Sequence, residues 1–265
     1  MRLQELFETT EEDRALISLS SSVYDRLEPY FNVDLDYTDE DEETVDIGKI
    51  GDLFDTPISV LNNVSIELQG GEPFIRRAKN IGATDSMEPS DKIILGIWDD
   101  TTRSIVINSD YLDSNRMRTT ITHELRHALD EYKSDSFPPS PKNKNPDVIN
   151  RYFTPKKKEH RSASPDSNIS YRAQPAEINA RFAEVLDTLA TRIIPRAIKS
   201  SPDQARSTIM HDLNHLLTKY EIADLFPERT ESRDYKRLIK RAVDFIDKEL
   251  AHNGVFYPKT RPNLG

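Results

Sequence analysis

The sequence predicts an α+β fold, in which a small mixed β-sheet lobe carries a central helix and a helical lobe follows at the C-terminal end. Two patterns support this prediction. Between about residues 57 and 108, short apolar stretches of strand length alternate with turn residues. From residue 174 onwards, apolar residues recur at helical spacing instead. The length of 265 residues is enough for one large domain or for two lobes that share a cleft.

The N-terminal region is predicted to be a helix followed by an acidic loop. Residues 11–30 repeat apolar side chains on one helical face, and Thr10 can cap the helix. The net charge of −10 comes from this region, because acidic residues concentrate between Asp34 and Asp46. An acidic run of this kind is typical of a solvated loop. It also argues against general binding of nucleic acid, since phosphate contacts need clustered basic residues.

Residues 57–132 are predicted to form a β/α lobe. A short helix is expected over Glu72–Asn80, and a second is expected from Asp113 or Ser114 to about Tyr132. A hairpin turn is expected at residues 99–102. The stretches that read as strands are Ile58–Leu61, Val64–Leu68, Lys92–Trp98 and Ser104–Asn108.

Residues 133–172 are predicted to be a long surface loop. They are rich in Lys, Ser, Pro and Asn, show no helical or strand period, and hold nine basic and four acidic residues. A loop of this length is unusual inside a compact domain. It is therefore either a solvated insertion or a segment that frames a cleft and attracts acidic substrates or the protein's own acidic N-terminus.

The C-terminal lobe, residues 173–265, is predicted to be helical. The expected helices cover about residues 174–199, with an interruption at Pro195, then residues 202–219 and residues 231–251. The predicted organisation is an acidic N-terminal helix and loop over residues 1–56, followed by one main domain over residues 57–265.

The composition also limits the chemistry and the location. With no cysteine, the chain has no disulfides and no thiolate metal site, so a transition metal must be held by His, Asp or Glu. The N-terminal residues lack the apolar core of a secretory signal, and the longest apolar run, Ile93–Trp98, is too short to span a bilayer. A cytoplasmic protein without membrane association is expected.

The motif that points to chemistry is HExxH, formed by His123, Glu124 and His127. On a helix, two histidines one turn apart project from the same face about 6 Å apart and can share one metal ion. Glu124 is rotated off that face, where a general base for attack by water belongs. The motif therefore predicts a catalytic zinc ion.

A catalytic zinc needs a third protein ligand. The extended motif HExxHxxGxxH is not present, because Asp130 replaces the glycine and Lys133 replaces the third histidine. The favoured third ligand is Glu177, in the first turn of a helix that begins at Pro175. Small residues one turn later let that helix approach the HExxH helix closely. The remaining candidates are His160, His211, His215, His252 and Glu184.

Each candidate also has a plainer interpretation. Glu177 could be an acid favoured by the helix dipole. Glu184, on the same face two turns later, could be a ligand but is more often a residue that orients a histidine. His211 and His215 form a second pair one turn apart, which is expected to be a solvated flank of its helix. Arg126 and Asp130 could support the ligands, although surface ion pairs are the commoner outcome.

The segment HELRHALDEY at residues 123–132, followed by Tyr171 and then by Glu177, resembles the gluzincin metallopeptidases, and in particular the catalytic domain of anthrax lethal factor and its relatives. The resemblance covers about residues 104–190. It implies a zincin-like fold, zinc held by His123, His127 and Glu177, and Glu124 as the base. It also implies that Tyr171 donates a hydrogen bond to the oxyanion. The first eight residues are similar to the starts of tailed-phage proteins.

The expected function is a zinc-dependent endopeptidase that acts on a protein or peptide substrate and needs one Zn²⁺ per chain. The alternative is a catalytically silent zincin-like protein with a structural role, such as a virion component with protein partners if the chain is phage-encoded. Neither function involves nucleic acid or a membrane.

Overall fold

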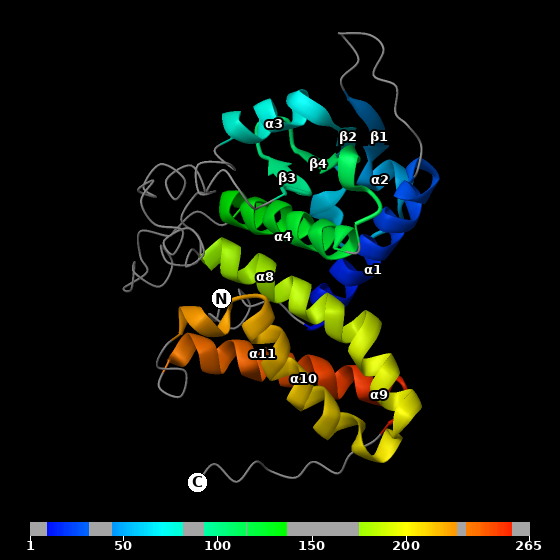
Figure 1. Cartoon of the computed structure of the whole chain (residues 1–265), viewed down its shortest axis with the longest axis vertical. Helices are drawn as coiled ribbons and strands as arrows, with labels where there is room; N and C mark the ends of the chain where they lie inside the picture. Colours follow the sequence, from blue (N-terminus) through cyan, green and yellow to red (C-terminus); the bar gives the residue numbers. More distant parts are fainter. Residues whose placement is uncertain are drawn as a thin grey trace. The chain divides into compact units, whose positions relative to one another are not determined.

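The computed structural model describes residues 10–31, 44–81, 93–114, 116–136, 175–226 and 232–255. The chain divides into two compact units (Figure 1). The first, called the sheet unit, comprises Glu11–Glu184, and the second, called the helical unit, runs from Val185 towards the C-terminus. The fold is mixed α+β.

The sheet unit is built on a four-stranded sheet within the described residues, with strand order β1-β2-β4-β3. β1 pairs with β2 antiparallel, β2 pairs with β4 parallel, and β3 pairs with β4 antiparallel. The mixed sheet expected from the sequence is confirmed. The strands are β1 (Val45–Lys49), β2 (Ser65–Gln69), β3 (Gly96–Asp99) and β4 (Ser104–Asn108).

Two local predictions about this sheet were wrong. Ile58–Leu61 was expected to be a strand, but Ser59–Leu61 is a 3₁₀ turn. β1 was missed, since it begins at the end of the acidic stretch that reads as a loop. It forms because β2 offers a partner edge, and a register shift between Asp46 and Gly48 adapts the pairing. Gly48 has a φ of 119°, which favours glycine over residues with a side chain.

Three helices of the sheet unit agree with the sequence prediction to within a few residues: α1 (Thr10–Leu27), α3 (Gly71–Asn80) and α4 (Met117–Ser136). The short α2 (Ile50–Leu53) was not predicted. α4 begins at Met117, three or four residues later than predicted, and Ser109–Tyr111 form a separate 3₁₀ turn after β4. α4 carries the HExxH motif, so the helix that the motif requires is present.

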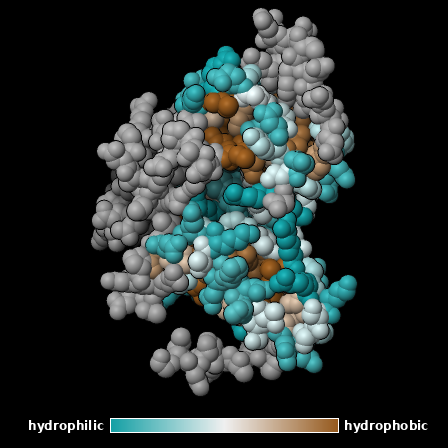
Figure 2. Space-filling model, in the orientation of Figure 1, coloured by the Kyte–Doolittle hydropathy of each residue, from teal (hydrophilic) through white to brown (hydrophobic). Residues whose placement is uncertain are grey.

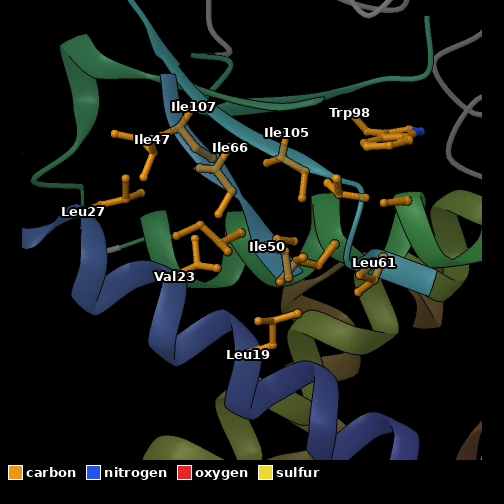
Figure 3. Packing of buried hydrophobic residues seen from close by; sticks show 14 of the residues in the cluster. Leu19, Val23, Leu27, Ile47, Ile50, Leu61, Ile66, Trp98, Ile105 and Ile107 are labelled. Atoms are coloured by element: carbon orange, nitrogen blue, oxygen red, sulfur yellow. The ribbon is translucent and has the colours of Figure 1, made fainter. Parts of the chain in front are cut away.

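The main core of the sheet unit lies between the sheet and helices α1 and α4. Leu19, Val23 and Leu27 of α1 point towards Ile66 and Ile105 of the sheet (Figure 3). Ile121, Leu125 and Ala183 belong to the same cluster of buried residues. The N-terminal helix is therefore an integral part of the unit that holds the HExxH helix.

The opposite face of the sheet carries a second, smaller core. Phe74 and Ala78 of α3 pack there against Ile97 and Val106. Ile105 and Ile107 face the main core, while Val106 between them faces α3, as the alternation of side chains along a strand requires. Both faces of the central strands are thus covered.

The helical unit contains α9 (Ile194–Ser200), α10 (Ala205–Lys219) and α11 (Arg233–His252). α8 (Pro175–Thr188) belongs to the sheet unit as far as Glu184 and continues into the helical unit. Pro195 was expected to interrupt its helix. The chain instead passes through a π-helical turn at Leu189–Ile193, which accommodates a residue that has no N–H to donate.

The surface is largely hydrophilic on the face that Figure 2 shows, with hydrophobic surface confined to patches on each unit. The most exposed large apolar side chains in the described part of the chain are Ile75, Ile93 and Tyr132. Among the described helices, none is long and apolar enough to cross a membrane.

Candidate metal centre

The two histidines of the HExxH motif lie one turn apart on α4, as the sequence predicted. Their Nε2 atoms are 3.0 Å apart, and the two rings are inclined at 75° with centroids 4.6 Å apart. Both imidazoles therefore present a ring nitrogen to the same point in space. His127 is buried, and His123 is partly exposed.

Glu177 brings a carboxylate to the same point from the first turn of α8. Its Oε2 atom lies 3.6 Å from Nε2 of His123 and 3.5 Å from Nε2 of His127. Only 4% of Glu177 is exposed. In the described part of the chain, His123, His127 and Glu177 are the group whose ligand atoms are close enough to hold one metal ion.

The spacing of these three atoms fits a tetrahedral zinc ion. Zinc–nitrogen bonds of about 2.0–2.1 Å at tetrahedral angles place neighbouring ligand atoms about 3.3 Å apart. The three separations here, 3.0, 3.5 and 3.6 Å, bracket that value. Within the described residues, Oε2 of Glu177 is buried and has no hydrogen-bond partner. A buried acceptor that faces two imidazole nitrogens is suited to a cation.

Small side chains let α8 approach α4, as the sequence analysis expected. Ala180 and Ala183 are both buried, and Ala183 packs in the same core cluster as Leu125 and Ala128 of α4. Larger side chains at these positions would push the Glu177 carboxylate away from the histidines.

Glu184 contacts the far side of the His123 ring. Its Oε1 atom lies 2.7 Å from Nδ1 of His123, whereas Glu177 faces Nε2 of the same ring. This contact favours the tautomer with a proton on Nδ1, which leaves Nε2 free to bind a metal. Of the two roles considered for Glu184, the geometry favours orientation of the histidine over ligation.

Arg181 is a residue of this site that the sequence analysis did not identify. Its Nε donates a hydrogen bond of 2.7 Å to Oε1 of Glu177, one turn earlier on α8. The spacing of four residues between Glu177 and Arg181 was a signal for this pair, because an acid and a base at this spacing meet on one face of a helix.

The charges of the site shift two pKa values in opposite directions. Burial by itself lowers the pKa of His123, but the Glu177 and Glu184 carboxylates outweigh burial and raise this pKa well above its ordinary value of 6.5. Burial raises the pKa of Glu177, but His123 and, to a smaller degree, His127 lower it well below its ordinary value of 4.5. In the absence of a metal, the cluster therefore favours a protonated His123 between two carboxylates.

Glu124 is not one of the three residues whose ligand atoms lie together. It is buried, and it packs close to the backbone of the edge strand β3. A Cβ atom on Gly96 would lie 3.5 Å from Cγ of Glu124 and only 3.0 Å from Cγ2 of Thr120. The absence of a side chain at Gly96 thus gives β3 its close approach to α4 at this position.

β3 is also fastened to the C-terminal half of α4. The indole Nε1 of Trp98 donates a hydrogen bond of 2.6 Å to Oε2 of Glu131. Because Gly96 and Trp98 alternate with Ile97, both face α4 while Ile97 faces α3. The edge strand therefore lies along the HExxH helix.

Arg126 corrects an expectation from the sequence. A surface ion pair was the favoured interpretation of Arg126 and Asp130, but Arg126 is fully buried, with 0% of its surface exposed. Its Nη2 lies 2.7 Å from Oδ1 of Asp130, and its Nη1 lies 3.8 Å from Glu12 and 4.0 Å from Asp13 of α1. Asp130 in turn accepts a hydrogen bond of 3.3 Å from Asn179 of α8.

This set of contacts links three helices around the cluster. Arg126 immediately precedes His127, and Asn179 follows Glu177 by two residues. The contacts therefore tie α1, α4 and α8 together next to two of the three candidate ligands. Sequence spacing predicts the pair on α4, but the partners on α1 and α8 depend on the tertiary fold.

The other candidates do not join this cluster or lie outside the described residues. His211, His215 and His252 are exposed and belong to the helical unit. Tyr171, His160 and most of the basic stretch at residues 133–172 lie outside the described residues, so the expectations placed on them stay predictions.

The comparisons with known proteins add no match: no family model, curated protein or solved structure matches this chain.

Proposed function

We propose that this chain is a zinc-dependent endopeptidase with a zincin-like fold, related to the gluzincins. The observation that carries the proposal is the buried Oε2 of Glu177, which faces Nε2 of His123 and Nε2 of His127 at 3.6 and 3.5 Å. Two imidazoles and one carboxylate are the donor set of many catalytic zinc sites.

In this proposal, His123, His127 and Glu177 hold the ion, and Glu184 keeps His123 in the tautomer that can bind it. The ion, when bound, supplies a Lewis acid that lowers the pKa of water and polarises the substrate carbonyl. Glu124 accepts a proton from the attacking water and passes it to the amine nitrogen that leaves. Tyr171 is proposed to donate a hydrogen bond to the developing oxyanion.

The position of β3 at the edge of the sheet is an argument for a peptide substrate. In the described residues, β3 pairs with β4 on one side and has no strand partner on the other. Its backbone passes beside Glu124. A peptide in extended conformation could add to such an edge by main-chain hydrogen bonds and so place one of its carbonyl groups near the base.

A second candidate function is a catalytically silent zincin-like protein, structural or virion-associated, whose metal stabilises the fold. The burial of the cluster favours this candidate: Glu177, His127 and Glu124 are each less than 10% exposed. A catalytic site must admit substrate, whereas a structural metal site is closed.

Glu124→Gln separates the two candidates. Wild-type protein and the variant would be loaded with zinc, analysed for metal content, and incubated with a diverse peptide library whose products are identified by mass spectrometry. The proposal expects cleavage by the wild type and a loss of about 10²–10⁴-fold in the variant, because the variant lacks the general base. Zinc content should be unchanged.

Other results would contradict the proposal. Cleavage that survives in Glu124→Gln would remove the mechanistic assignment. A wild type that binds zinc but cleaves no peptide would favour the structural candidate.

A further inference from the structure

The two oxygens of the Glu177 carboxylate have different partners. Oε1 accepts the 2.7 Å hydrogen bond from Nε of Arg181, while Oε2 faces the two histidines. The contact is inside the protein, since Glu177 is 4% exposed and the side chain of Arg181 is 19% exposed. One oxygen is therefore engaged, and the other is directed to the proposed metal site.

This arrangement bears on how Glu177 can bind a metal. A carboxylate can use one oxygen or both, and using both fills one more coordination position. A catalytic zinc needs three protein ligands and an open fourth position. We propose that Arg181 is a positioning residue that holds Glu177 in one-oxygen coordination and so keeps the fourth position open. This inference rests on the function proposed above.

Arg181 has two opposing effects on metal affinity. Its positive charge repels a cation, which weakens binding. Its hydrogen bond fixes the carboxylate, which strengthens binding, and loss of such an outer contact typically costs about 10–100-fold in metal affinity. We expect the orienting effect to dominate, so that loss of Arg181 weakens metal binding.

Two substitutions separate charge from geometry. Arg181→Gln removes the charge and shortens the side chain. Arg181→Lys keeps the charge but replaces the planar guanidinium with a flexible ammonium group. If orientation is the role of Arg181, both variants should change the site. If only charge matters, Arg181→Lys should behave like the wild type.

The test uses Co²⁺ as a probe on the full-length chain, because the visible absorption of Co²⁺ is strong in a four-coordinate site, intermediate in a five-coordinate site and weak in a six-coordinate site. Affinity is measured by competition with a chelator. Both variants should bind Co²⁺ about 10–100-fold more weakly than the wild type and absorb less per bound ion. Arg206→Gln, which removes an exposed ion pair with Asp247 in the helical unit, is the matched control and should leave both readings unchanged.

The outcomes distinguish failure of this inference from failure of the proposed function. If the wild type binds Co²⁺ and Arg181→Gln gives the same affinity and the same spectrum, the inference is overturned and the metal site stands. If Arg181→Lys alone matches the wild type, orientation is overturned in favour of charge. If the wild type binds neither Co²⁺ nor Zn²⁺, the proposed function fails and the inference fails with it. Circular dichroism of each variant, compared with the wild type, checks that the variant is folded.

Discussion

The chain contains two pairs of histidines at the same helical spacing, and the two pairs differ in their burial and in the carboxylates that surround them. His123 and His127 on α4 face a buried carboxylate, and a second carboxylate contacts the outer nitrogen of His123. His211 and His215 on α10 are exposed. The acid between them, Asp212, pairs instead with Arg196 at 2.9 Å.

The difference shows what distinguishes a candidate metal site from an ordinary pair of helical histidines. Spacing alone brings two imidazoles to one face, and both helices satisfy it. The first pair also faces a carboxylate from another helix, has a second carboxylate at the outer nitrogen of one ring, and is partly buried, which strengthens the electrostatics. Among the described residues, the second pair has no carboxylate from another element close enough to complete a metal site.

The largest difference between the two pairs should appear on removal of one histidine. His127→Ala removes a proposed ligand and should abolish stoichiometric zinc, whereas His215→Ala should leave one zinc per chain. Elemental analysis of the purified variants measures this directly. Equal zinc content in the two variants would show that the pair on α4 is not the metal site.

Glu177→Ala should cause the next largest loss of metal affinity. It leaves His123 and His127 in place but removes the proposed third ligand, and the pair on α10 has no counterpart of that ligand. The loss of affinity should exceed the roughly 10–100-fold that is typical of a lost outer contact. Competition with a chelator gives the value. A variant that keeps wild-type affinity would mean that another residue supplies the third ligand.

Glu184→Gln should have a smaller effect, since it weakens the orientation of His123 without removing a ligand. A loss of about 10–100-fold in zinc affinity is expected. Asp212→Asn changes the acid next to His211 and serves as the matched control, for which no change is expected. If Glu184→Gln leaves zinc affinity intact, its contact with Nδ1 does not orient the ring for binding.

The smallest expected difference between the two histidine pairs is in how they affect the pH dependence of stability. In the metal-free protein, His123 has a raised pKa, so its contribution is complete below about pH 6.5 and is lost as the pH rises through the raised pKa. Glu177 has a lowered pKa, so its contribution is present above about pH 4.5 and is lost as the pH falls through the lowered pKa. The cluster therefore stabilises the metal-free chain most between about pH 4.5 and 6.5.

Urea unfolding of the metal-free protein across this range measures the effect. The wild type should lose stability above the window, and Glu177→Gln should lose less, because only the Glu184 carboxylate then remains to hold the proton on His123. His211→Ala should follow the wild-type profile. A wild-type profile that stays flat above the window would contradict the charge arrangement inferred for the cluster.

Several features of the fold were predictable from the sequence because they depend on local patterns. α1, α3 and α4 follow from helical periodicity, and β4 follows from an apolar run next to a turn. β1 was missed, and Ile58–Leu61 was wrongly predicted as a strand. A short segment becomes a strand only if a partner edge is available, and that availability is a tertiary property.

The residues of the candidate site likewise divide into those that local sequence predicts and those that depend on the tertiary fold. His123, Glu124 and His127 could be identified because their relation lies within one helix. Glu177 could be favoured as the third ligand because it lies at the start of a helix and small residues follow it. Its distance to the histidines could not be predicted. The burial of Arg126 and the contact between Arg181 and Glu177 were not foreseen.

By itself, the sequence determined the chemistry on offer: no thiolate ligand, two histidines one helical turn apart, and an acid between them. These are properties of composition and of the 3.6-residue period, so they need no knowledge of the fold. Only the tertiary structure showed that Glu177 lies close enough to His123 and His127 to complete a candidate metal site. The distance from Glu177 to the histidines depends on how closely α8 packs against α4. Two imidazoles beside a buried carboxylate attract a cation more strongly than two imidazoles in water.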